Sequence, residues 1–354
     1  MNQVKVFQIG CGKMSKYIMR YVYEKQGVIV GAVDINKEIV GKDIGVVMES
    51  DPKSVCIEPV EKLDALLKET KPQVAIITTM SFLNDIASVL RICIKNGVHV
   101  LTTCEEAFFA KNSNPVLFQE MDSLAKAHNV TVIGCGYQDI FWGNMISNLC
   151  ASMQKITKIK GSSSYNVEDY GLALAMAHGA GFTKEEFAKE IGSTNGMSEE
   201  ERQKLMEEKA FFPSYMWNVV GWLAHKLHLH ITSQVQECIP VMCETKLTSS
   251  TLDLELEKGS VRGMRAVVRA MTEENIILEV ECVGKVYTPS EVDYNEWTIF
   301  GEPTTKVFND SPSTVELTCG DVVNRIPQVI KAPRGFLSTA DLPEPQFVFD
   351  LNKV

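Results

Sequence analysis

Along the first 140 residues, short runs of apolar residues alternate with stretches in which apolar residues recur every three or four positions. The apolar runs lie at residues 4–9, 28–33, 74–77, 98–102 and 130–133, and the helical periodicity is clearest over 14–22, 83–94 and 117–125. Apolar runs of this length are typical of buried parallel strands covered by helices. The sequence therefore predicts an α/β domain with a parallel sheet over residues 1–140.

The pattern changes after residue 140. Strand-like segments lie at residues 155–163, 252–256, 261–271 and 276–283, and helical stretches lie at 184–191, 198–209 and 215–228. In residues 252–256 leucines alternate with acidic residues, which is typical of an antiparallel strand with one face in water. We therefore predict a second, mixed α+β domain with a largely antiparallel sheet over residues 141–310. The prolines within residues 311–354 indicate a C-terminal tail that packs back on the body.

The composition narrows the class of protein. The 354 residues include 35 Lys and Arg against 45 Asp and Glu, for a net charge of −10, and 45% of them are hydrophobic. This acidic balance argues against nucleic-acid binding, which needs a basic surface. We read no signal peptide or membrane span, and the ten cysteines form no regular framework. We therefore expect a cytoplasmic protein that acts on a small molecule and binds neither nucleic acid nor membrane.

A glycine motif lies where the first predicted strand meets the first predicted helix. It reads Gly10-Cys11-Gly12-Lys13-Met14-Ser15, and its glycines leave the N–H groups of the helix N-terminus open to a pyrophosphate. Asp34 ends the second predicted strand, where a carboxylate can accept hydrogen bonds from the ribose. Together they predict a Rossmann dinucleotide-binding domain. Asp34 favours NAD because it would repel a 2′-phosphate, whereas Lys13 and Lys37 leave NADP open as the alternative.

Polar clusters follow three of the other predicted strands. They are Thr78, Thr79 and Met80 after residues 74–77, Thr103, Cys104 and Glu105 after 98–102, and Tyr137 and Asp139 in the turn 134–139. Ligands of such sheets bind beyond the carboxyl ends of the strands, so we expect the first two clusters to line the cofactor and the third to line the substrate. The alternatives are that the threonines cap helices and that the glycines of the turn only reverse the chain.

The histidines point to chemistry less clearly. His178 lies in a glycine-rich segment of the second domain, where it could act as an acid or base in the cleft or simply be a solvated loop residue. His225, His228 and His230 lack a carboxylate or cysteine at a matching offset, so we predict no metal site.

The chain also resembles known families. Its N-terminal half, with the glycine motif and the turn at residues 102–105, resembles the dihydrodipicolinate-reductase type of Rossmann domain. The more specific match is the tail, where VVNRIPQVIKAPRGF over residues 322–336 and TADLP over 339–343 resemble the C-terminal signature of the 2,4-diaminopentanoate dehydrogenases. This resemblance covers essentially the whole chain. The sequence departs from the pattern at Gln138, Asp139 and Arg334, where we would expect proline or glycine.

The resemblance implies NAD- or NADP-dependent oxidative deamination of 2,4-diaminopentanoate to 2-amino-4-oxopentanoate and ammonia, a step of ornithine fermentation. From their placement, we expect Glu105 and Asp139 as the groups that move the protons of this reaction, and Tyr137 and His178 as groups that hydrogen-bond or position the substrate. Arg262, Arg265 and Lys246 are the alternatives for binding its carboxylate. The resemblance also implies a homodimer formed through the sheet of the second domain.

Two other functions compete with this one. The first is a related dehydrogenase or imine reductase acting on another diamino acid, such as diaminopimelate, because substrate choice depends on loops and not on the fold. The second is a non-catalytic NAD(P)-binding redox sensor, which would bind the cofactor without amine-dependent turnover.

Overall fold

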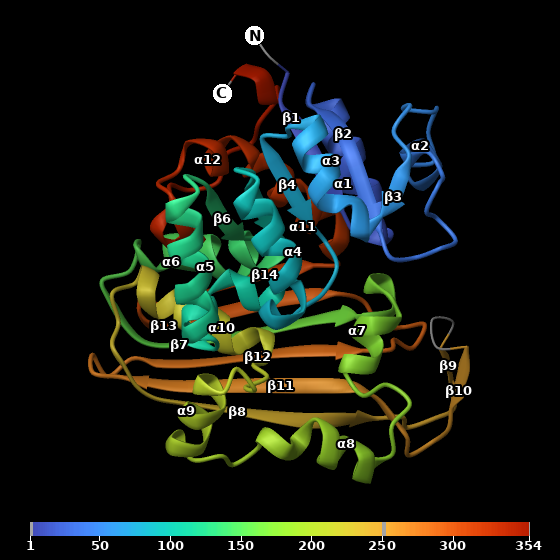
Figure 1. The fold of residues 1–354 in the computed structure, drawn as a ribbon. Helices are drawn as coiled ribbons and strands as arrows, with labels where there is room; N and C mark the ends of the chain where they lie inside the picture. The colour runs from blue at the N-terminus through green and yellow to red at the C-terminus, as the bar shows by residue number, and fades with distance from the viewer. Residues whose placement is uncertain (1–2, 250–252, 354) are drawn as a thin grey trace. The chain divides into compact units, whose positions relative to one another are not determined.

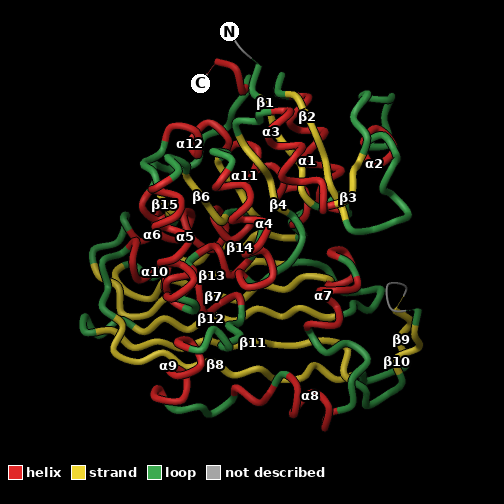
Figure 2. Tube along the Cα trace, viewed as in Figure 1, coloured by secondary structure: helices red, strands yellow, loops and turns green. Residues whose placement is uncertain are grey.

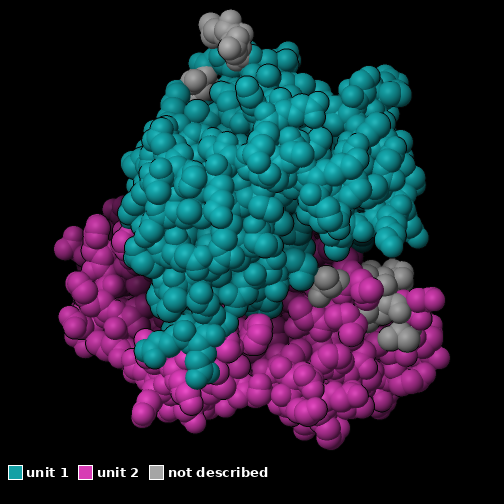
Figure 3. Space-filling model, viewed as in Figure 1, with its two compact units in different colours: residues 1–140, 206–209, 316–354 teal, residues 141–205, 210–315 magenta. Residues whose placement is uncertain are grey.

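The computed structural model describes residues 3–249 and 253–353, and these divide into two compact units. Unit 1 comprises residues 1–140, 206–209 and 316–354, and unit 2 comprises residues 141–205 and 210–315 (Figure 3). The C-terminal segment from residue 316 thus belongs to the same unit as the N-terminal 140 residues.

Unit 1 is built on a parallel sheet with the strand order β15-β6-β5-β4-β1-β2-β3. Strands β1, β2, β3, β4 and β6 of this sheet are labelled in Figure 1. Its strands are β1 (Lys5–Ile9), β2 (Val28–Asp34), β3 (Ile57–Pro59), β4 (Val74–Ile77), β5 (His99–Thr102), β6 (Thr131–Gly134) and β15 (Gly335–Leu337). The helices are α1 (Lys13–Glu24), α2 (Ile44–Val47), α3 (Leu63–Thr70), α4 (Leu83–Lys95), α5 (Pro115–Ala127), α11 (Thr314–Asn324, which begins in unit 2) and α12 (Ile326–Lys331).

The helices of unit 1 bury the apolar stripes that the sequence predicts. In α4, for example, Ile86, Leu90 and Ile94 lie on one face and join the apolar core of the sheet. Helix α12 packs against β4, β5 and β6, and α5 packs against β6 and β15. Strand β15 pairs in parallel with β6, so a segment from the end of the chain completes the edge of the N-terminal sheet.

Unit 2 contains a mixed sheet with the order β14-β13-β7-β12-β11-β8. Figure 2 shows its long strands side by side. The strands are β7 (Lys155–Asn166), β8 (Ile231–Met242), β11 (Val261–Thr272), β12 (Ile277–Lys285), β13 (Tyr294–Glu302) and β14 (Thr305–Asp310); β9 (Leu247–Ser249) and β10 (Leu254–Leu256) form a separate ribbon. The pairing is antiparallel except between β7 and β12.

The helices of unit 2 are α6 (Met145–Cys150), α7 (Leu172–Ala177), α8 (Lys184–Glu190), α9 (Glu199–Glu207, whose end belongs to unit 1) and α10 (Tyr215–Lys226). Helix α10 packs against β11 and β12, and its tryptophans Trp217 and Trp222 are buried. These elements confirm the predicted fold class, a Rossmann-like domain with a mixed α+β domain. Leu252, which we assigned to a strand, lies outside the described residues.

No helix in the described parts of the chain is long and apolar enough to cross a membrane. Likewise, residues 3–249 and 253–353 contain no group of three or more metal-ligating side chains. His230, one of the three closely spaced histidines, instead pairs with Glu274, with 2.7 Å between Nδ1 and Oε1.

Candidate active site

The turn between β1 and α1 has the geometry of a phosphate-binding loop. Gly10 has a φ of +86°, and a Cβ atom there would lie 2.6 Å from Cγ2 of Thr79, so glycine is required on both counts. Gly12 is the N-cap of α1, and a Cβ there would meet no atom within 4 Å. Ser15 is buried and its hydroxyl donates to the Gly12 carbonyl at 2.7 Å. Serine is therefore accommodated at the position of the usual third glycine, because its hydroxyl is hydrogen-bonded within the turn.

Asp34 holds the same turn from the end of β2. Its carboxylate accepts hydrogen bonds from the N–H groups of Cys11 and Asn36, the latter at 2.7 Å. Burial, with a smaller contribution from Asp34, raises the pKa of the Cys11 thiol to about 12, so this thiol stays neutral. The adjacent Lys13 is exposed. The arrangement fits a dinucleotide: a glycine N-cap leaves room for the pyrophosphate at the N-terminus of α1, and a carboxylate lies at the ribose position.

The residues after β4 divide into a structural and an exposed set. Thr78 donates to the Gly10 carbonyl at 2.9 Å, whereas Thr79 and Met80 are exposed beyond the strand. Sequence reasoning missed Gln8, a fully buried residue of β1 whose amide donates to both Gly10 and Thr78. A polar residue within an apolar run was the signal for it, because a buried amide must be hydrogen-bonded.

The turn after β5 places the two glutamates differently. Thr103 donates its N–H to Ile77, and Cys104 is buried with its thiol near the Ser81 carbonyl, 3.1 Å away. Glu105 is half-buried, whereas Glu106 is buried and accepts hydrogen bonds from the Leu83 N–H at 2.7 Å and the Ser113 hydroxyl at 2.9 Å. Glu106 therefore anchors the turn, and Glu105 is the less buried of the two carboxylates. The two glutamates are adjacent in one polar cluster of the sequence, which does not by itself separate their tasks.

The turn after β6 is held from α11. Gly136 has a φ of +143° and donates its N–H to Asp321 at 2.9 Å, and the Tyr137 N–H donates to Thr318 at 3.3 Å. The Tyr137 side chain is buried. Gly134 is required for another reason, since a Cβ there would lie 2.4 Å from the Ala107 carbonyl carbon. The glycines of this turn thus have structural tasks, as the alternative interpretation proposed, and they also bring Tyr137 and Asp139 to the end of β6.

Asp139 does not have the surroundings of Glu105. It is fully buried and forms an ion pair with Arg325, whose Nη2 and Nε lie 2.6 and 2.7 Å from Oδ2. Burial raises the pKa of Asp139, although Arg325 opposes that shift. A fully buried carboxylate that holds a guanidinium is poorly placed to take a proton from a substrate.

His178 lies in unit 2, with both ring nitrogens engaged. Nδ1 donates to the Leu174 carbonyl at 2.8 Å, so Nε2 is the acceptor for the Tyr165 hydroxyl at 2.7 Å. Burial lowers the pKa of His178 to about 4. The solvated-loop alternative is therefore wrong, because the ring is buried among Tyr165 and Tyr215. A neutral His178 that orients Tyr165 is a better description than an acid or base.

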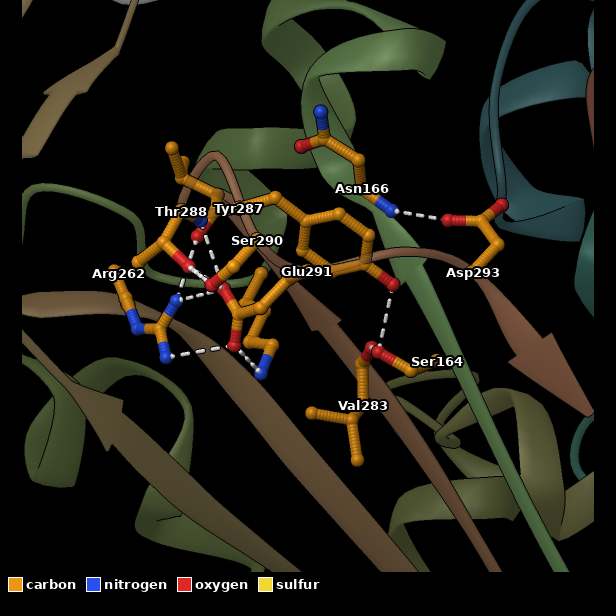
Figure 4. Close-up of polar contacts among 11 residues, drawn as sticks. Ser164, Asn166, Arg262, Val283, Tyr287, Thr288, Ser290, Glu291 and Asp293 are labelled. Carbon is orange, nitrogen blue, oxygen red and sulfur yellow. Dashed lines mark hydrogen bonds and ion pairs between the residues drawn. The ribbon is translucent and has the colours of Figure 1, made fainter. Parts of the chain in front are cut away.

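Each residue considered for the substrate carboxylate already faces a glutamate. Figure 4 shows Arg262 beside Glu291. The two guanidinium nitrogens Nη1 and Nη2 donate to the Glu291 carboxylate at 2.5 and 3.1 Å, and Lys285 also bonds Glu291. Burial raises the pKa of Glu291, but its bonds to Arg262 and Lys285 outweigh burial and bring that pKa to about 2. Beside this cluster, Tyr287 bonds Ser164 at 2.8 Å (Figure 4).

The other two cations are also paired. Arg265 lies 3.8 Å from Glu281, and Lys246 lies 3.1 and 3.2 Å from Glu255 and Glu257. Consequently none of the three candidates stands out as the partner of a substrate carboxylate.

Within unit 1, the predicted cofactor residues lie on the turns that follow β1, β2, β4 and β5, which are neighbours in the parallel sheet. The carboxyl ends of parallel strands meet at one edge, so these turns share that edge. Tyr137 and Asp139 join them from β6, next to β5. His178 belongs to the other unit.

Comparison with known proteins agrees with this geometry. Residues 141–353 match the family model described as the 2,4-diaminopentanoate dehydrogenase C-terminal domain, and residues 6–133 match the saccharopine dehydrogenase NADP binding domain. Together with the glycine turn and Asp34, the second match identifies NAD(P) as the cofactor.

Individual relatives point the same way. The chain is 23% identical to a 2,4-diaminopentanoate dehydrogenase of Acetoanaerobium sticklandii over 98% of this chain and 96% of that protein. It is 32% identical to an amine dehydrogenase from Mycobacterium smegmatis, whose solved structure superposes with a TM-score of 0.90 over 99% of this chain and 98% of that one. A dihydrodipicolinate reductase from Paenisporosarcina sp. TG-14 shares only the fold, at 14% identity and a TM-score of 0.51 over 97% of this chain and all of that one.

The family match covers more than half of the chain and includes the tail signature at residues 322–343. The match to the Mycobacterium smegmatis enzyme extends over both units. The chain therefore belongs to the 2,4-diaminopentanoate dehydrogenase family of NAD(P)-dependent amine dehydrogenases.

Proposed function

We propose that this protein oxidises the 4-amino group of 2,4-diaminopentanoate, with NAD or NADP, to give 2-amino-4-oxopentanoate and ammonia. The observation that carries the proposal is a half-buried carboxylate, Glu105, on the turn after β5, at the same sheet edge as the dinucleotide-binding residues. The tail signature and the relative in Acetoanaerobium sticklandii support this substrate. We further propose that the reaction serves ornithine fermentation in the cytoplasm.

The reaction requires two proton movements around one hydride transfer. The substrate ammonium must first lose a proton, because only the neutral amine can expel hydride from its carbon. NAD(P), when bound, accepts that hydride. Water then adds to the resulting iminium carbon, and the carbinolamine releases ammonia. The sum is substrate ammonium, oxidised cofactor and water giving ketone, ammonium ion, reduced cofactor and one proton.

We assign Glu105 as the group that takes the ammonium proton and then assists the attack of water. Asp139 is the second candidate, but its complete burial against Arg325 favours the half-buried Glu105. Tyr137 is proposed to contact the substrate. His178 is proposed to act through Tyr165, whose hydroxyl it binds at 2.7 Å.

The two units suggest a division of labour. We propose that residues 1–140 bind the dinucleotide. Residues 141–310 are proposed to bind the substrate and to form the contact between the subunits of a homodimer. The tail, residues 311–354, is proposed to pack back on the body of the protein. The sheet of unit 2 supports the subunit contact, because charged residues of both signs follow one another across β11, β12 and β7.

The first experiment follows the absorbance of reduced nicotinamide and the release of ammonia with purified protein, 2,4-diaminopentanoate and either cofactor at mildly alkaline pH. We expect both signals, and a higher rate with NAD than with NADP because of Asp34. Diaminopimelate and short aliphatic amines form the comparison panel. Faster turnover of a panel amine would replace the proposed substrate, and absence of any amine-dependent signal would contradict the proposal.

The role of Glu105 is tested by Glu105→Gln. Loss of a general base is expected to lower kcat by roughly 10²- to 10⁴-fold while the protein still binds NADH. Glu24→Gln, a change of the same type at an exposed residue of α1, is the control and should leave kcat unchanged. Turnover of Glu105→Gln near the control value would move the base to another residue.

A further inference from the structure

A buried cluster of two carboxyl groups and one guanidinium lies behind the turn that carries Tyr137. Asp139 is 2.6 Å from Arg325, and Asp321 lies 3.9 Å from the same guanidinium. The side chains of Asp139 and Arg325 are 0% exposed and that of Asp321 is 1% exposed. The rest of the guanidinium bonds Gln328 and the Pro343 carbonyl, so the cluster is tied to the C-terminal tail.

Residues of α11 and its C-terminal end bind the turn at three positions. Asp321 accepts the N–H of Gly136, Thr318 accepts the N–H of Tyr137, and Arg325 binds the carboxylate of Asp139. Thr318, Asp321 and Arg325 are three and four residues apart, a spacing that places side chains on one face of a helix and the turn that follows it. One face of α11 and its C-terminal end thus holds the whole turn.

The charges of the cluster balance only if it holds one proton. Two ionised carboxylates against one guanidinium would bury a net negative charge, which is costly in a medium that solvates ions poorly. Burial, followed by the nearby charge of Asp139, raises the pKa of Asp321 well above its usual range. Burial and the charge of Asp139 thus favour the neutral form of Asp321, whereas the Arg325 guanidinium favours the ionised form of Asp139.

We propose that Thr318, Asp321 and Arg325 are positioning residues that hold the turn after β6, and through it Tyr137, in the geometry that the amine substrate requires. The inference rests on the proposed function, since it takes Tyr137 as a substrate contact. It gives Asp139 the task of an anchor for the turn and leaves Glu105 as the proton acceptor.

The experiment compares Asp321→Ala, Asp321→Asn and Thr318→Val with the wild type. Asparagine keeps the oxygen that accepts the Gly136 N–H and resembles a neutral carboxyl group, so it should be tolerated; alanine and valine each remove one acceptor. Asp122→Ala is the matched control. Asp122 is 7% exposed, also lies in unit 1 and also holds a backbone N–H, that of Phe336 at 3.0 Å, but it is no part of the site.

Two readouts are needed. The first is steady-state kinetics with the amine that the wild-type protein oxidises fastest. Losing one hydrogen bond to the turn should raise KM for the amine by about tenfold, with little change in kcat and none in KM for the cofactor. The second is hydrogen exchange of the amides of Gly136 and Tyr137, which needs no substrate. We expect faster exchange in Asp321→Ala and Thr318→Val than in the control Asp122→Ala or in Asp321→Asn.

The outcomes separate this inference from the proposed function. Failure of the wild type to oxidise 2,4-diaminopentanoate would remove that substrate but leave both readouts usable with another amine. The inference is overturned if Asp321→Ala and Thr318→Val match Asp122→Ala in amide exchange, or if exchange rises and KM for the amine stays at the wild-type value. If Asp321→Ala does not fold, Thr318→Val and Asp321→Asn decide the question, because they change shape least.

Discussion

His178 illustrates how burial changes the chemistry of a single residue. Its Nδ1 donates to Leu174, its Nε2 accepts from Tyr165, and Gly284 lies so close that a Cβ there would be 2.6 Å from Nε2. A second proton on the ring would have to sit at Nε2, where it would meet a hydroxyl that now donates. The neutral ring is therefore part of the packing of unit 2.

This environment predicts a pH dependence of stability. The unfolded chain binds a proton on His178 near its ordinary pKa of 6.5, whereas the folded protein does so only at about 4. The free energy of unfolding should therefore be largest above pH 6.5 and fall as the pH drops toward 4, by up to about 3 kcal/mol. Urea denaturation of the wild type and His178→Gln across this range measures it. Equal slopes in the two proteins would contradict the prediction.

At the scale of elements, Glu106 joins three segments of unit 1. Helix α4 begins after Phe82, which provides no side-chain cap, and the carboxylate of Glu106 accepts the Leu83 N–H instead. The same carboxylate accepts the Ser113 hydroxyl just before α5. Glu106, in the turn after β5, thus caps helix α4, which precedes it in the chain.

Removing this contact should destabilise unit 1. Glu106→Ala leaves the Leu83 N–H and the Ser113 hydroxyl without their acceptor, which should cost about 1–3 kcal/mol in the free energy of unfolding. Glu106→Gln, which keeps one acceptor oxygen, should cost less. Asp85→Ala, at an exposed acid in the first turn of α4, is the control. Equal stabilities of Glu106→Ala and the control in urea denaturation would show that Glu106 does not cap α4.

At the scale of the whole molecule, the proposed homodimer would form through one face of the unit 2 sheet. Across neighbouring strands Arg269 of β11 pairs with Glu279 of β12, and Glu279 pairs with Lys160 of β7. On the edge strand β14, Phe308 is 54% exposed. Charges of both signs together with an exposed apolar residue allow the same face of a second copy to pack against it about a two-fold axis.

We therefore expect light scattering to give twice the chain mass of 39.4 kDa. The double variant Arg265→Glu and Arg269→Glu should shift the protein toward the monomer, since it places negative charge beside the glutamates of β12. Lys68→Glu, at an exposed residue of α3, should leave the mass unchanged. A wild-type mass near that of one chain would refute the dimer.

Several elements were beyond the reach of sequence patterns. The sequence pattern does not predict strand β13, because a polar residue, Asn295, takes a fully buried position in it and interrupts the alternation of apolar and polar residues. Asn295 accepts hydrogen bonds from the indole N–H groups of Trp142 and Trp297. At helices α11 and α12 the sequence pattern indicates only a proline-containing tail. Pro327 is tolerated because it lies in the first turn of α12, where its missing N–H has no partner to lose.

The sequence by itself determined what local pattern can encode: the alternation of apolar runs and helical stripes, the glycine turn with Asp34, and the tail signature. Only the tertiary structure decided that β15 joins β6, that Arg325 binds Asp139 and that His178 binds Tyr165. The physical reason is distance along the chain. Gly136 and Asp321 are 185 residues apart. Their contact forms only when both segments pack around one core, so it leaves no trace in the local pattern of apolar and polar residues.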